Sequence, residues 1–156
     1  MTPAQISALR PIVLAEPSLA QAVLTGQDSV IAAWCNALAD PAVIAWKTSI
    51  TTQQIGEAMN STEVGGLTTA NTNRLMVMES YSGGTFNPSR ADTRAGFDGV
   101  FSGAGGVLTR AALLVLYKRS ATRAEKALAT GTGSDASPAT LTFEGLVSID
   151  DAGLMR

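Results

Sequence analysis

The sequence of 156 residues predicts a mainly α-helical protein, a small helical bundle followed by an extended C-terminal arm with a short β-strand or hairpin. Helix-capping residues precede prolines or apolar runs at several points in residues 1–130. Apolar residues between these points follow the i, i+3, i+4, i+7 spacing of an amphipathic helix. After residue 130 the chain becomes rich in Gly, Ser and Thr, which is typical of a flexible linker. We therefore expect a helical body at 1–130 and an interaction arm at 131–156.

The first 46 residues contain the signals of several short helices. Thr2-Pro3-Ala4-Gln5 combines a capping threonine, a proline at the first helical position and a glutamine placed for a capping box. Glu16-Pro17 and Asp40-Pro41 repeat the arrangement of an acid before a proline. A further helix is expected from Asp28 to Ala39, and its apolar positions are Ile31, Trp34, Cys35 and Leu38.

The helical pattern continues through residues 46–130. Residues 46–50 could be extended, and Thr51 with Gln54 forms a second candidate capping box. Gly65-Gly66, the loop 81–90 and the SGAGG break at 102–106 separate the expected helices at 67–80, 88–103, 108–119 and 122–130. The helix at 88–103 places Arg94 to pair with Asp98 at i+4. The helix at 108–119 is the most apolar, so we expect it at the centre of the core.

The expected arm has three parts. TGTGSDASPAT at 130–140 lacks apolar anchors and predicts a linker, TLTFEGLVSID at 140–150 predicts a strand or hairpin, and a last helical turn begins at Asp150. A strand of this kind could add to the sheet edge of a neighbouring molecule. The interface candidates in the arm are Leu141, Phe143, Leu146, Val147, Ile149, Asp150 and Asp151.

Charge is scarce and unevenly distributed. Charged residues make up 15% of the chain, against about 25% in an average protein. This occurs in subunits covered by partners, and in many ordinary globular proteins. Residues 61–133 carry eight bases and five acids, whereas residues 134–156 carry one base and four acids. Either this division is chance, or the acidic tail of one subunit lies on the basic surface of another. The basic candidates are Arg110, Lys118, Arg119, Arg123 and Lys126, and Trp46 with Lys47 is a candidate interface anchor.

The sequence offers little for catalysis, and it predicts a non-enzymatic protein without a cofactor or a bound metal. Histidine is absent, and the lone Cys35 lies in an apolar helical run, which favours a buried structural thiol. The glycine-rich stretches at 103–106 and 131–133 lack the strand-to-helix context of a nucleotide site. With no second cysteine the chain cannot form an internal disulfide, which fits folding in the cytoplasm. No signal peptide or membrane-spanning stretch is visible, so we expect no membrane partner.

Three segments carry a resemblance to a known family. They are AWKTSITTQQIGEAM at 45–59, FNPSRADTRAGFDGVFSG at 86–103 and RSATRAEKALATGTGSDASPATLTFEGLVSIDD at 119–151. In their residues and in their order along the chain they resemble small virion proteins of tailed bacteriophages, and we place them with the head-to-tail connector (adaptor) proteins. The resemblance spans nearly the whole chain but contains no catalytic motif.

This resemblance implies a ring-forming structural subunit of the virion, assembled in the host bacterial cytoplasm. Its implied partners are further copies in a dodecameric ring, the portal protein above, a tail or head-closure protein below, and packaged DNA that passes through the channel without sequence reading. A strongly predicted terminal helix of the family is replaced here by TLTFEGLVSID.

Other functions stay open at this point. The chain could be another head-closure or tail-end component of a phage. It could also be a prophage-encoded small-ligand binder with a pocket around Asp92, Arg94 and Asp98. A DNA-binding regulator would bind DNA in a salt-sensitive way, which a net charge of −2 does not favour.

Overall fold

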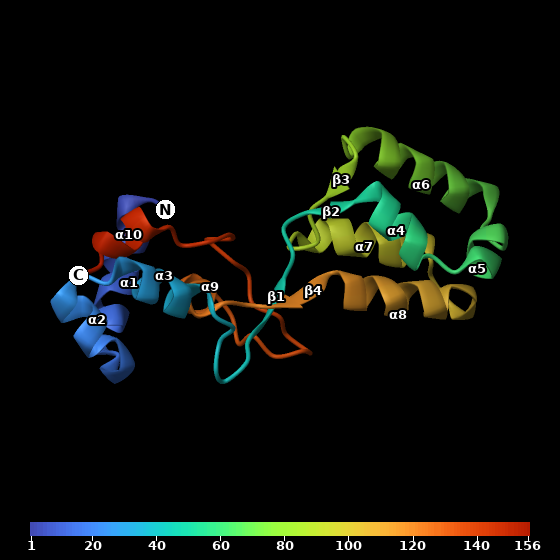
Figure 1. The fold of residues 1–156 in the computed structure, drawn as a ribbon. Helices are drawn as coiled ribbons and strands as arrows, with labels where there is room; N and C mark the ends of the chain where they lie inside the picture. The colour runs from blue at the N-terminus through green and yellow to red at the C-terminus, as the bar shows by residue number, and fades with distance from the viewer. The chain divides into compact units, whose positions relative to one another are not determined.

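The computed structural model describes residues 1–156, and the mainly α-helical class is confirmed by ten α-helices and four short strands (Figure 1). The chain forms two compact units. Unit 1 comprises Met1–Ala45 and Ser120–Arg156, and unit 2 comprises Trp46–Arg119. The chain leaves unit 1 in strand β1 (Ile44–Trp46) and returns in strand β4 (Lys118–Ser120), and these strands pair in a two-stranded sheet.

Each unit has its own set of elements. Unit 1 contains α1 (Pro3–Ala15), η1 (Pro17–Leu19), α2 (Ala20–Thr25), α3 (Asp28–Asn36), α9 (Arg123–Leu128) and α10 (Ile149–Gly153). Unit 2 contains β2 (Ile50–Thr51), α4 (Thr52–Ala58), α5 (Ser61–Gly65), α6 (Thr69–Tyr81), β3 (Thr85–Phe86), α7 (Ala91–Val100), η2 (Ala104–Gly106) and α8 (Val107–Leu116). The strands β2 and β3 pair antiparallel, with Ile50 opposite Phe86.

The expected helix starts are confirmed where capping boxes were predicted. Thr2 with Gln5 caps α1, Thr51 with Gln54 caps α4, and Thr122 with Glu125 caps α9. Each pair satisfies two backbone donors that a helix start leaves open. The helix expected from Asp28 ends early, at Asn36 instead of Ala39. The helix ends there because the next residue pairs with another segment: the Ala37 carbonyl accepts a hydrogen bond from the Arg123 amide at 2.9 Å.

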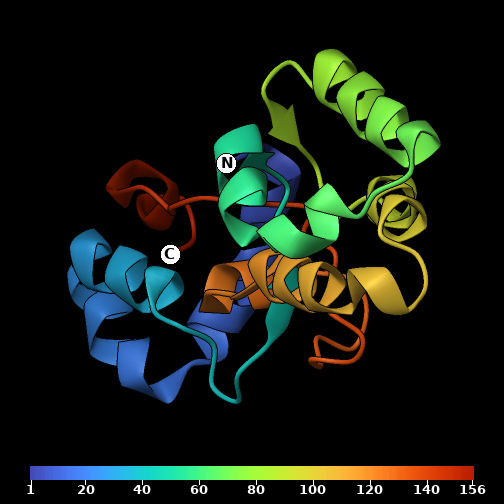
Figure 2. The same cartoon turned by 90° about the vertical axis from the view of Figure 1, so that its right-hand side faces the viewer.

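The division expected at residue 130 differs from the structure, because the C-terminal segment belongs to unit 1. Val147, Ala152 and Met155 are buried in one core with the apolar faces of α1 and α3. Helix α10 lies beside α3 in both views (Figures 1 and 2). The strand or hairpin expected at 140–150 is absent, and only single bridges form at Ala139 and Thr140. The segment is irregular, as its composition predicts, but it is packed and does not form a separate arm.

Polar contacts fix this segment along its length. The side-chain amide of Asn36 accepts a hydrogen bond from the Val147 amide at 2.8 Å and donates one to the Val147 carbonyl at 3.0 Å. The carboxylate of Glu125, itself buried, accepts from the Gly145 amide at 3.3 Å. Because buried backbone groups need partners, these side chains let an irregular segment enter the core.

Both chain ends are held by charge. The N-terminal ammonium of Met1 lies 3.1 Å from a carboxylate oxygen of Asp151, and Arg156 Nε lies 2.7 Å from Asp28 Oδ1. Hydrogen bonding from Ser148, helped by the ammonium group, holds the pKa of Asp151 below its ordinary value. An ion pair therefore holds each end of the chain in unit 1.

Cys35 is fully buried between the helices of unit 1, which confirms the predicted structural thiol. Burial raises the pKa of its thiol to about 11, because the apolar surroundings disfavour the thiolate. The thiol therefore stays protonated and unreactive at neutral pH.

The core of unit 2 is built around aromatic and aliphatic side chains from β2, β3, α4, α6, α7 and α8. Phe97 of α7 packs edge-on against Phe86 with ring centroids 5.0 Å apart. Helix α8 contributes Thr109 and Leu113 to the interior. The Glu63 carboxylate accepts from the amides of Leu108 and Thr109 at 2.9 and 2.7 Å, and so caps the start of α8.

Replacing Met155 by Ala should lower the free energy of unfolding by about 2–5 kcal/mol, because the fully buried side chain leaves a cavity in unit 1. Urea unfolding followed by circular dichroism measures this change. Leu154→Ala is the matched control, since Leu154 is exposed, and it should change stability by less than about 0.5 kcal/mol. Equal, small effects of both substitutions would contradict the burial of the C-terminus.

The variant Asp151→Asn should be less stable than the wild type by about 0.5–1 kcal/mol at pH 7. A carboxylate with a lowered folded-state pKa stabilises the fold above its ordinary pKa, and this stabilisation is lost as the pH falls through the lowered value. The difference between variant and wild type should therefore vanish in acid. Asp150→Asn, which removes an exposed carboxylate next to it, is the control. A difference that persists unchanged in acid would show that charge is not its cause.

Candidate functional site

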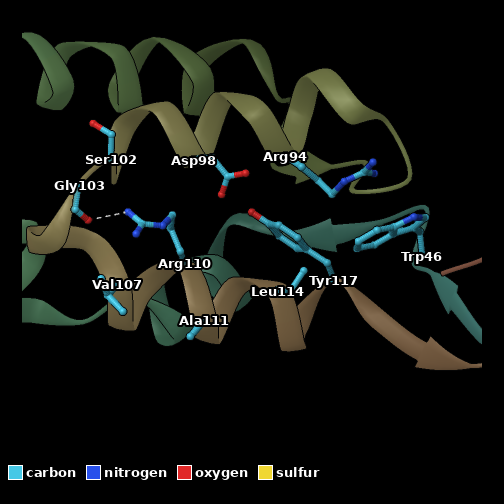
Figure 3. A pocket seen from close by; sticks show the side chains of 10 residues that line it. All are labelled: Trp46, Arg94, Asp98, Ser102, Gly103, Val107, Arg110, Ala111, Leu114 and Tyr117. Carbon is cyan, nitrogen blue, oxygen red and sulfur yellow. Dashed lines mark hydrogen bonds between the residues drawn. The ribbon is translucent and has the colours of Figure 1, made fainter. Parts of the chain in front are cut away.

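A concave site in unit 2 lies between α7 and α8 and has a volume of about 620 Å³. We call it the α7–α8 cleft. Figure 3 shows Arg110 and Tyr117 pointing from α8 toward α7, and Asp98 pointing back from α7. The cleft is lined by Trp46, Arg94, Asp98, Ser102, Gly103, Val107, Arg110, Ala111, Leu114 and Tyr117.

Arg94 is held at one end of the cleft. Its Nη1 donates to the carbonyl oxygens of Pro88 and Ser89, and its guanidinium carbon lies 4.1 Å from the centre of the Trp46 ring. This stacking is a cation–π contact. The predicted ion pair between Arg94 and Asp98 is wrong, because these contacts turn the Arg94 guanidinium toward the start of α7 and the Trp46 ring.

Arg110 is held at the other end. Its Nη1 donates to the carbonyl of Phe101 and, at 3.0 Å, to the carbonyl of Gly103 (Figure 3). These bonds tie α8 to the turn that follows α7. Because a guanidinium carries five N–H donors, Arg110 keeps donors for a bound acceptor after making these bonds.

Tyr117 lines the cleft, and its hydroxyl is buried and has no hydrogen-bond partner. In Figure 3 it points toward α7, on the side where Asp98 lies. Burial, with a smaller contribution from the Asp98 carboxylate, raises the pKa of this phenol, so it stays protonated. A buried hydroxyl without a partner costs free energy, which a bound acceptor would recover.

Helix α8 is apolar on its outside as well. Val107, Leu108, Leu114 and Val115 are between 45 and 76% exposed, and Ala111 between them is also exposed. These five residues recur at helical spacing and form what we call the α8 outer face. The expectation that this helix lies at the centre of the core holds only for its other side, through Thr109 and Leu113. A helix that is apolar all round normally has both faces covered.

The five predicted basic residues do not form one cluster within a unit. Arg110, Lys118 and Arg119 belong to unit 2, whereas Arg123 and Lys126 belong to unit 1. Of the predicted anchor pair, Trp46 lines the α7–α8 cleft and Lys47 does not.

Arg123 and Lys126 line a second hollow, of about 490 Å³, in unit 1. The guanidinium carbon of Arg123 lies 4.9 Å from the centre of the Trp34 ring, and Lys126 Nζ donates to the carbonyl of Pro41 at 3.2 Å. Glu16 and Asp40 also line this hollow and balance its two positive charges. The charged groups of Arg123 and Lys126 therefore already contact other residues of unit 1.

The seven arm candidates are divided by burial. Leu141 and Val147 are buried, Phe143 is half-buried against the core of unit 1, and Asp151 pairs with the N-terminus. The others remain outside. Leu154, which the sequence did not single out, is exposed as well. We give the name C-terminal face to these exposed residues of the C-terminal segment: Leu146, Ile149, Asp150 and Leu154.

Asp92 lies outside the α7–α8 cleft. Its carboxylate pairs with the Arg90 guanidinium at 2.6 Å, and hydrogen bonding from Arg90 holds the pKa of Asp92 below its ordinary value. The pocket expected around Asp92, Arg94 and Asp98 therefore contains only the last two. Tyr117 and Leu114 were missed as site residues, although the continuous apolar run LLVLY is a signal that α8 has two apolar faces.

No group of three or more Cys, Asp or Glu side chains is placed to hold a metal ion. No single helix is long and apolar enough to cross a membrane, and the one helix pair with suitable length and composition, residues 91–100 with 104–116, is bent by 116°. Comparisons of the chain with protein-family models, curated proteins and solved structures found no match.

The variant Tyr117→Phe should leave the free energy of unfolding unchanged or raise it by up to about 1 kcal/mol, because it removes a buried hydroxyl that has no partner. Thermal and urea unfolding measure the effect. Tyr81→Phe is the control, since that tyrosine is exposed on α6 and its hydroxyl is solvated. A loss of more than 1 kcal/mol on Tyr117→Phe alone would mean that the hydroxyl has a partner in the folded chain.

Proposed function

We propose that this chain is a non-enzymatic structural subunit of a tailed-phage particle, a ring-forming head-to-tail adaptor that joins the portal to the tail and extends the DNA channel. The resemblance of three long segments to such virion proteins motivates the proposal. In this role the chain binds further copies of itself, the portal protein and a tail or head-closure protein. DNA passes along the ring without being read.

The observation that carries the proposal is the amount of exposed apolar surface on a chain with few charges. Fifteen large apolar side chains are exposed, and four of them lie on the α8 outer face. Scattered exposed apolar residues are ordinary, whereas a continuous apolar helix face normally marks a contact surface. Repeated contacts of this kind close a ring that no single strong contact has to hold.

The α7–α8 cleft favours one other function, the binding of a small ligand. Two guanidiniums, one carboxylate and the unpartnered Tyr117 hydroxyl surround a partly apolar hollow, which would suit a small molecule that carries a carboxylate. Leu108 and Val115, the most exposed residues of the α8 outer face, do not line the cleft and have no part in this function, so we rank it second.

Particles of the phage that encodes the chain test the proposal directly. We expect a phage that lacks the gene to produce DNA-filled heads and separate tails that do not join, as seen by electron microscopy of lysates. Expression of the wild-type chain from a plasmid should restore joined particles, which is the control. Normal tailed particles in the absence of the chain would contradict an adaptor role.

A further inference from the structure

We propose that the α8 outer face of one copy binds the C-terminal face of a second copy, in a head-to-tail contact. This inference rests on the proposed function, because it names the surfaces by which an assembly subunit would meet its neighbour. The occupant of the α8 outer face is then unit 1 of another copy of this chain, and every copy offers one surface of each kind.

The receiving surface combines an apolar stripe with positive charge. Val115 is 76% exposed and Leu108 61%, and both lie on the α8 outer face. Val107, Ala111 and Leu114 of the same face also line the α7–α8 cleft, so the stripe continues into a hollow. Arg110 lies within that hollow and has N–H donors that its two carbonyl partners leave available.

The C-terminal face has the complementary chemistry. Leu146, Ile149 and Leu154 are between 57 and 76% exposed, although their neighbours Val147, Ala152 and Met155 are buried. Asp150 is exposed among them and carries a carboxylate. This face therefore offers apolar side chains beside one exposed carboxylate, on a segment that the core of unit 1 already holds in place.

The charges of the two units favour contact between unlike units. Unit 1 contains four basic and eight acidic residues, which gives a net charge of −4. Unit 2 contains seven basic and five acidic residues, which gives +2. Two copies that met through the same unit would bring like charges together, whereas unit 1 against unit 2 brings opposite charges together.

A contact between two different surfaces is heterologous, and it repeats from copy to copy until the path closes. Rings and open filaments are built by contacts of this type, whereas a contact between two identical surfaces stops at a dimer. The division of charge between the units thus points to the kind of contact that a ring requires.

Two variants with one disabled surface each test this pairing. Val115→Glu places an acid on the α8 outer face, and Leu146→Glu places an acid on the C-terminal face, so the two altered faces repel each other. Both positions are 76% exposed, so we expect the variants to fold with an unchanged melting temperature. Sedimentation velocity over a concentration series should show self-association of the wild type, weakened at least tenfold in each variant alone.

An equimolar mixture of the two variants gives the decisive result. The mixture retains one competent contact, between the α8 outer face of the Leu146→Glu chain and the C-terminal face of the Val115→Glu chain. We expect a 1:1 dimer that does not grow further. The matched controls carry the same changes on other exposed apolar sites, Val77→Glu in unit 2 and Leu24→Glu in unit 1, and should associate as the wild type does.

Each other outcome overturns the pairing. Loss of association with Val115→Glu but not with Leu146→Glu would indicate a contact between two α8 outer faces. Normal association of both variants would place the contact elsewhere, and the adaptor function would still stand on the particle experiment. A wild-type chain that stays monomeric at every concentration would remove the inference, while the particle experiment decides the adaptor function independently.

Discussion

The burial of the C-terminal segment against the N-terminal helices is the constraint on which the rest of the structure depends. Val147, Ala152 and Met155 complete a core that α1 and α3 begin. The ends of the chain meet, with Met1 paired to Asp151. Both ends of the chain are part of unit 1. Residues 46–119 therefore form a second unit, which is inserted between strands β1 and β4. Removal of either end would therefore expose the apolar faces of the other.

This arrangement changes how the chain would engage a partner. A flexible arm loses conformational entropy when it binds, which offsets part of the contact energy. A face whose backbone is already fixed loses less, so modest exposed apolar areas are enough for useful affinity. In the C-terminal face, Leu146 and Ile149 stand on a segment fixed by Asn36 and by the core. In the assembly that we propose, the contacts would form between preformed surfaces.

Local signals in the sequence predicted the local structure well. The capping boxes at Thr2, Thr51 and Thr122 begin helices, since each depends only on residues three positions apart. The packing of residues 131–156 could not be predicted in this way. It depends on single long-range bonds, such as those of Asn36 with Val147, which leave no periodic pattern. The α8 outer face was hidden for a related reason, because an apolar run alone does not show which side faces a core.

Hydrogen exchange in the free chain tests most directly whether the C-terminus is part of a finished fold. The amides of Val147, Ala152 and Met155 all donate within unit 1. We expect them to exchange as slowly as the central amides of α1 and α3, since one core holds all three segments. Fast exchange of these amides, beside protected amides in α1 and α3, would mean that the segment is loose in solution and would contradict the account.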